Sequence, residues 1–431
     1  MLKVEDGPDQ SAKISEDPAP GSAVRQRMFS LVWTVEGFGL LLVTVLSFIP
    51  RLHHVQEYVF FTLLVVAVGT AWFEGKQIWV RTPIDPLLFL FIGWVLLTIP
   101  FATDPAYSFS EWRKLVAHML VFYWVLLVLR VRNDGATMLR MMATVALGSL
   151  VLNAYGLIDF IWQGGTWKGR GIRAEAPSSN SIVLSTYVVI AVPLLAAAAI
   201  SMPIKWLRAG CGGVFALAAL TQVLTYTRGG WIGSIAEGIA FGLITGRHRL
   251  VIGVLGGGVA FGAGFLFLSQ FGYQQGVTST HSLFERVDVW RLGIQEIIAH
   301  PIFGVGYGDY TFNMRFSGYA EAELAKGLHN TFLMVAMGSG IPALTFLVAA
   351  LVGAVWHLLR SSRQVPDRTV YVFVIAIAIM IVGFAVRNFF EYMFAGSLAY
   401  LFWIFVATGL AQAAPQARSS MMRNTGLSSH E

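Results

Sequence analysis

Residues 281–308, HSLFERVDVWRLGIQEIIAHPIFGVGYG, lie inside one long polar interruption of the chain, which runs from Gln270 to Leu328. An apolar run, RLVIGVLGGGVAFGAGFLFLS at 249–269, precedes the interruption, and another begins directly after it at His329-Asn330. Runs of this length and composition predict membrane spans. Every other connection between apolar runs is much shorter. We therefore expect the chemistry of the protein to lie in or beside this interruption.

The composition predicts an all-α membrane protein that crosses the bilayer many times. Of its 431 residues, 56% are hydrophobic and 13% are charged, whereas soluble domains carry about 25% charged residues. The sequence contains no Lys/Arg-rich run of the kind that indicates nucleic-acid binding. Cys211 is the only cysteine, which excludes an intrachain disulfide and a cysteine-rich zinc site.

The domain organisation follows from counting apolar stretches of roughly twenty residues. We predict a disordered cytoplasmic tail (1–28), nine spans (29–269), a large periplasmic loop (270–328), three further spans (329–413) and a second cytoplasmic tail (414–431). The loop is expected to contain amphipathic helices. The predicted spans lie near 29–50, 57–73, 86–101, 114–129, 136–160, 181–203, 204–226, 229–246, 249–269, 329–358, 369–394 and 396–413.

The Lys and Arg residues set the expected orientation, because insertion favours cations in inner loops. With the N-terminus inside, every predicted inner loop carries at least two cations, and both termini are cytoplasmic. Several arginines nevertheless fall at or near the outer ends of predicted spans: Arg170, Arg173, Arg228, Arg286 and Arg387. Their shared position predicts an outward-facing cationic pocket at the membrane surface.

The stretch TRGGW at 227–231 is predicted to form a tight outer hairpin. Gly229 and Gly230 would let the backbone approach a ligand closely. A helix that begins there presents free N–H groups to an anion, and Arg228 adds a fork suited to phosphate. An arginine that reaches the lipid headgroups beside an interfacial tryptophan is the alternative.

His281 to His300 is predicted to be an amphipathic helix. Its apolar positions follow the i, i+3, i+4, i+7 pattern, and Arg286 falls at the edge of that stripe. Arg286 would then point along the membrane surface, where a lipid pyrophosphate lies. The alternative is a surface arginine paired with a neighbouring carboxylate. The apolar positions are Leu283, Val287, Trp290, Ile294 and Ile297.

His329-Asn330 is predicted to open the tenth span, with Asn330 as the helix N-cap. The positive end of the helix dipole favours neutral imidazole, which a general base requires. An interfacial histidine without a chemical role is the alternative. The preceding GVGYG at 304–308 has no strand before it and is interpreted as a sharp turn rather than a nucleotide-binding loop.

Arg387 and Glu391 are four residues apart near the outer end of a predicted span, so they are expected to pair on one helix face. A structural ion pair is favoured over contact with a ligand. Glu36 and His118 fall within predicted spans, where ionisable side chains are costly, and the sequence assigns neither a role.

The ordered motifs TRGGW (227–231), RVDVW (286–290), HPIFGVG (300–306) and HNTFL (329–333) resemble the O-antigen ligase and polymerase superfamily. Within it, the chain looks most like the lipopolysaccharide O-antigen ligases. The resemblance implies a fold similar to the C class of glycosyltransferases, in the inner membrane of a Gram-negative bacterium. It further implies metal-independent, inverting transfer of glycan from undecaprenyl pyrophosphate to lipid A–core oligosaccharide at the periplasmic face, with no cofactor.

By resemblance, Arg228 and Arg286 hold the pyrophosphate, and His329 is the loop-end histidine essential for transfer. We predict in addition that Arg173 or Arg170 joins the pyrophosphate site and that His329 is the catalytic base. Possible supporting residues are Asn330, Gly229, Gly230, Arg387, Glu391 and His281. An O-antigen polymerase or a protein O-oligosaccharyltransferase would use the same chemistry with another acceptor. A transporter of anionic solutes or lipid-linked glycans is the alternative from a different class, although cations crowded at one face do not favour it.

Overall fold

The computed structural model describes residues 20–131, 135–164, 172–177, 180–271, 281–319 and 327–413. Within these ranges the chain is helical and contains no strand, so the predicted all-α fold is confirmed. The main helices are α1 (Pro20–Ser47), α2 (His53–Phe73), α3 (Asp85–Thr98), α4 (Pro105–Val131), α5 (Gly135–Trp162), α6 (Ser181–Ser201), α7 (Lys205–Leu224), α8 (Arg228–Ile244), α9 (His248–Ser269), α11 (His281–Ala299), α12 (Thr311–Arg315), α14 (Thr331–Ser362), α15 (Arg368–Arg387) and α16 (Gly396–Ala413).

Ten of the described helices are long and apolar enough to cross a membrane. The protein is therefore a multi-pass membrane protein. The other two predicted spans are α3, with 14 residues, and α8, with 17 residues. At about 1.5 Å per residue these helices measure roughly 21 and 26 Å, against a hydrocarbon core of about 30 Å. The prediction of about twelve spans thus corresponds to ten long helices and two short ones.

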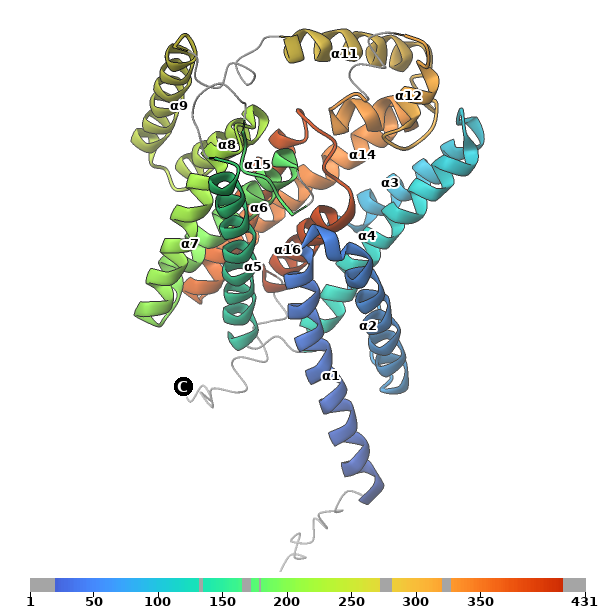
Figure 1. Cartoon of the computed structure of the whole chain (residues 1–431). Helices are drawn as coiled ribbons and strands as arrows, with labels where there is room; N and C mark the ends of the chain where they lie inside the picture. The colour runs from blue at the N-terminus through green and yellow to red at the C-terminus, as the bar shows by residue number, and fades with distance from the viewer. Residues whose placement is uncertain are drawn as a thin grey trace, which may run out of the picture.

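Helix α16 lies in the middle of the bundle (Figure 1) and packs against α4, α15, α14 and α1. Almost all of its residues are buried, Phe402 and Trp403 among them. Helix α9 is the opposite case: it stands at the edge of the bundle beside α8, and none of its span is buried. Lipid can solvate the apolar side chains of α9, so a span needs no protein cover to be stable there.

Several chain segments meet at one end of the bundle, which we call the site end (Figure 1). The backbone N–H of Thr331, at the start of α14, donates to the Asn388 carbonyl at 2.9 Å, just past the end of α15. The Thr227 hydroxyl, at the start of α8, lies 3.4 Å from the Ser181 carbonyl at the start of α6. Helix α11 caps this end above α14.

Helix α14 is broken after about its first quarter, and a loop fills the break. Ser339 and Gly340 have non-helical backbone angles, and the backbone of residues 301–306 pairs with the exposed groups. The N–H of Val305 donates to the Met337 carbonyl at 2.9 Å, and the N–H of Ile341 donates to the Pro301 carbonyl at 2.8 Å. A Cβ atom on Gly340 would lie 1.9 Å from the Ile302 carbonyl oxygen, so only glycine fits. The predicted turn is therefore a plug inserted into a membrane helix.

Helix α11 is amphipathic, but the buried stripe differs from the predicted one. Val289 and Gly293 are buried, whereas Val287 and Ile294 are exposed. The difference arises because Gly293 lets the helix approach Leu328 closely: a Cβ there would lie 2.5 Å from a Leu328 methyl carbon. The helix is thereby rotated so that Arg286 lies on the face packed against the bundle.

Candidate functional site

The start of α8 is held tightly against its neighbours by its two glycines. A Cβ on Gly229 would lie 2.7 Å from the Phe390 Cβ and 3.0 Å from Arg387 Nη1. A Cβ on Gly230 would lie 1.7 Å from the Ser185 hydroxyl. Protein atoms therefore fill the space beside both glycines. Their effect is to bring Arg228, the first residue of α8, next to the end of α15.

His329 is held in an uncommon backbone conformation, with φ of 47°. The left-handed region is disfavoured for residues with a side chain, although histidine enters it more often than most. Directly after it, the Asn330 side chain accepts hydrogen bonds from the N–H groups of Phe332 and Leu333 at 2.9 and 3.0 Å, so the predicted N-cap is confirmed. The strained residue therefore sits on a fixed helix start, an arrangement that is common at active sites.

Glu391 connects the histidine to an arginine. Its Oε1 lies 2.6 Å from His329 Nδ1, and its Oε2 lies 3.7 Å from Arg286 Nη2. Arg286 Nη1 also donates to the Phe390 carbonyl at 2.9 Å. Three segments that are far apart in the sequence thus meet at a single carboxylate.

The predicted helical pairing of Arg387 with Glu391 is wrong. Helix α15 ends at Arg387, so Glu391 lies in the irregular segment that follows and turns toward His329 instead. Arg387 is 1% exposed and remains within electrostatic range of both Glu391 and Arg286. Its Nε and Nη2 atoms have no hydrogen-bond partner among the described residues, which is costly for a buried guanidinium.

Arg228 completes the group, because the charges of Arg173 and Arg286 both act on it. The pKa of Arg173 is lowered by burial, against the opposing effect of Glu175. We call Arg173, Arg228, Arg286 and Arg387 the arginine cluster. Arg170 lies outside the described residues, and so does the side chain of His281.

The arginine cluster is poorly compensated by negative charge. Burial raises the pKa of Glu391, but the hydrogen bond to His329 and the charges of Arg387 and Arg286 outweigh it, so the pKa is lowered overall. Glu391 is therefore ionised at neutral pH. One buried carboxylate, with Glu175 near Arg173, faces four guanidinium groups. Such an arrangement is suited to bind an anion with more than one negative charge.

Two polar residues that the sequence did not single out hold this arrangement together. The Thr331 hydroxyl lies 2.6 Å from Asn388 Oδ1 and 3.1 Å from the Glu391 carbonyl. The same Asn388 oxygen accepts from the Met393 N–H at 3.1 Å. They fix the segment that carries Glu391 to the first turn of α14. An asparagine inside a predicted span (369–394) is a signal that could have pointed to this role.

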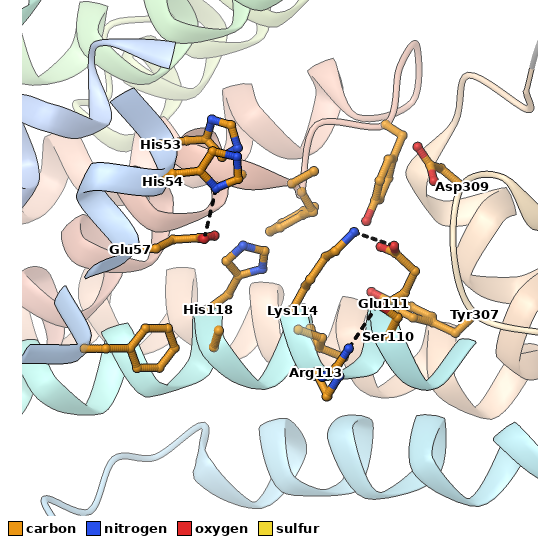
Figure 2. Close-up of a pocket in the computed structure, with 17 residues that line it drawn as sticks. His53, His54, Glu57, Ser110, Glu111, Arg113, Lys114, His118, Tyr307 and Asp309 are labelled. Atoms are coloured by element: carbon orange, nitrogen blue, oxygen red, sulfur yellow. Dashed lines mark hydrogen bonds and ion pairs between the residues drawn. The ribbon is translucent and has the colours of Figure 1, made fainter. Parts of the chain in front are cut away.

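The two ionisable residues left without a role now have distinct environments. Glu36 Oε2 accepts from Trp124 Nε1 at 3.0 Å between α1 and α4, which is a packing contact. The His118 ring packs edge-on against Tyr400 with centroids 5.2 Å apart. His118 also lines a cavity at the site end, which is shown in Figure 2.

Comparison with known proteins agrees with the motifs. Comparison with curated proteins gives no match. Residues 213–348 match the family model described as O-antigen ligase. The matched range contains Arg228, Arg286 and His329, while Arg387 and Glu391 lie beyond it. A region that spans about a third of the chain is therefore similar to the O-antigen ligase family.

Proposed function

We propose that this protein transfers O-antigen glycan from undecaprenyl pyrophosphate to a sugar hydroxyl of lipid A–core oligosaccharide. The reaction takes place at the periplasmic face of the bacterial inner membrane, with both termini in the cytoplasm. It is inverting and independent of metal. One observation carries the proposal: Glu391 contacts His329 at 2.6 Å and Arg286 at 3.7 Å, so the candidate base and the candidate pyrophosphate ligand share a partner.

The arginine cluster provides the donor site. Its guanidinium groups bind the pyrophosphate, and Arg228 and Arg286 make the first contacts. As the bond to the sugar breaks, negative charge grows on the leaving phosphate oxygen, and fixed cations stabilise that charge without having to reorganise. Arg387 contributes from beneath because its charge is buried and weakly compensated.

Glu391 orients the base. A carboxylate only accepts hydrogen bonds, so His329 Nδ1 carries the hydrogen and Nε2 is the basic nitrogen. Nε2 takes the proton of the acceptor hydroxyl, and the oxygen attacks the anomeric carbon from the side opposite the pyrophosphate. The bond to the phosphate oxygen breaks, its electron pair stays with undecaprenyl pyrophosphate, and the anomeric configuration inverts. The proton remains on His329 until it is released to solvent.

Two other acceptors fit the same chemistry. A polymerase would transfer the glycan to a second lipid-linked glycan, and a protein O-oligosaccharyltransferase would transfer it to a serine or threonine hydroxyl. The deciding measurement is purified protein in proteoliposomes, given labelled lipid-linked glycan and each acceptor in turn, with and without EDTA. We expect product with lipid A–core alone and no effect of EDTA.

A variant far from the site provides the control for this assay. Arg208 lies near the start of α7, at the opposite end of the bundle, and Arg208→Lys should transfer glycan at the wild-type rate. Transfer to the lipid-linked glycan or to the protein, without transfer to lipid A–core, would overturn the ligase assignment. Uptake of the glycan into vesicles without transfer would instead support the transporter.

A further inference from the structure

A polar cavity lies at the site end, and residues that directly follow Glu391 in the chain line part of it. It measures about 540 Å³, within the range of roughly 300–1,000 Å³ typical of small-molecule sites. Figure 2 shows that the start of α2, the first turns of α4 and residues 307–309 surround it. His118 rises from α4 toward its centre.

Residues 391–396 form the wall between this cavity and the arginine cluster. Glu391 faces His329 and Arg286, while the next residue, Tyr392, lines the cavity together with Ala395. Thr331, two residues after His329, reaches the cavity floor, where it lines a small void with His118 and Tyr392. A molecule in the cavity is therefore separated from the base by a single chain segment.

The charges of the cavity differ from those of the arginine cluster. Its lining holds two cations, Arg113 and Lys114, and three carboxylates, Glu57, Glu111 and Asp309. Lys114 Nζ lies 2.6 Å from Glu111 Oε1. Asp309 accepts from the Tyr107 hydroxyl at 2.8 Å at the rim. A lining without a cation excess does not favour a diphosphate, so the cavity and the cluster are suited to different ligands.

The lining is suited to a sugar. Carboxylates and imidazoles accept and donate hydrogen bonds to hydroxyl groups, and the rings of Tyr307, Tyr392 and Phe394 supply apolar faces. A lipid tail would leave the carboxylates without partners. An extended peptide would pair with a sheet edge, whereas the described residues around this cavity are helices and loops.

We propose that this cavity binds the terminal carbohydrate of the acceptor, so that donor and acceptor approach His329 from opposite sides of residues 391–396. The identification of the sugar as the acceptor rests on the proposed function. The binding of a sugar in the cavity does not depend on that function. Gly396, with φ of 51°, gives the wall a turn that other residues rarely adopt.

The test fills the cavity without changing a charge. Ala395 is exposed and lines the cavity, so Ala395→Trp occupies the space, and Ala395→Ser is its matched control. We expect Ala395→Trp to raise the KM for lipid A–core about tenfold or more, because a blocked pocket loses most of its contacts. The KM for the lipid-linked donor should stay the same in both variants.

A second measurement does not depend on transfer. Oligosaccharide released from lipid A–core is titrated into wild type and both variants by calorimetry, and wild type and Ala395→Ser should bind it while Ala395→Trp should not. Equal binding by the wild type and both variants, or a change in donor KM alone, would overturn the inference. Normal sugar transfer with loss only of serine or threonine glycosylation would assign the cavity to a peptide instead. Sugar binding without any transfer would count against the proposed function but not against the cavity.

Discussion

The arginines at the two ends of the bundle have opposite surroundings. At the end away from the site, Arg208 donates from Nε and Nη2 to the Met202 carbonyl at 2.9 and 2.7 Å, and Arg130 extends toward Gln77. At the site end, Arg387 is buried with two nitrogens unsatisfied by the described residues, and Arg228 and Arg286 repel each other. Arg208 and Arg130 have hydrogen-bond partners in nearby loops, and cations in such loops are sufficient to fix the topology. At the site end, the charges of the arginine cluster act on one another and are only partly compensated by Glu391, which supports the proposed anion site.

The largest effect on activity is expected for a substitution of His329 at the site end. His329→Ala should lower the rate of transfer about 10²- to 10⁴-fold, the contribution usual for a general base. The affinity for undecaprenyl pyrophosphate should be retained, since the arginines remain. Single-turnover rates and donor binding to the purified variant measure the two effects separately. Transfer near the wild-type rate would remove His329 from the mechanism.

The next effect is expected at the carboxylate that joins the two halves of the site. Glu391→Gln keeps the shape but loses the charge that orients His329 and pairs with Arg286. We expect kcat to fall about 10- to 100-fold, in line with about 1.5–3 kcal/mol for a hydrogen bond to a charged group. Glu57→Gln, in the cavity rather than at the wall, should leave kcat at saturating acceptor unchanged. A normal kcat for Glu391→Gln would show that the 2.6 Å contact is only structural.

A smaller effect, on the KM for donor, is expected when the same arginine-to-lysine substitution is made at each end of the bundle. Arg228→Lys keeps the charge but loses the planar fork, so the KM for donor should rise about tenfold if the contact with phosphate is bidentate. Arg208→Lys makes the same change where the partner is a backbone carbonyl, and should leave KM unchanged. Equal effects of the two substitutions would mean that Arg228 acts only as a general positive charge.

The smallest effect concerns stability and pH. The pKa of Glu391 in the folded protein lies below the ordinary value of 4.5. The ionised side chain therefore stabilises the fold fully above pH 4.5, and this contribution is lost as the pH falls through the lowered pKa. The difference in thermal midpoint between wild type and Glu391→Gln should shrink between about pH 5 and about pH 3. A difference that grows on acidification would contradict the lowered pKa.

The sequence predicted the membrane helices well, because hydropathy reports directly on transfer into lipid. The structure also brings Arg228, Arg286 and His329 to one place, since Arg286 and His329 share Glu391 and the charge of Arg286 acts on Arg228. The partner of His329 was missed. Helical spacing predicted that Glu391 pairs with Arg387. Because α15 ends at Arg387, Glu391 is not on that helix and contacts His329 instead.

The cavity could not be predicted for a related reason. His54 and Asp309 are more than 250 positions apart in the sequence, and packing of α2, α4 and the 307–309 loop brings them together. The rotation of α11 depends on one close contact between Gly293 and Leu328, which a hydrophobic pattern does not reveal. Local periodicity therefore predicts helices, but it does not reveal the contacts between distant residues that form the cavity.

The plug in α14 has a consequence for exchanging loops between related enzymes. The carbonyl of Pro301 and the N–H of Val305 complete the hydrogen bonding of Met337 and Ile341, so the loop and the broken helix are one folding unit. A chimaera joined at residue 330 would insert a foreign loop against a helix break built for another partner. Grafts of donor or acceptor specificity should therefore move residues 301–342 as a single cassette.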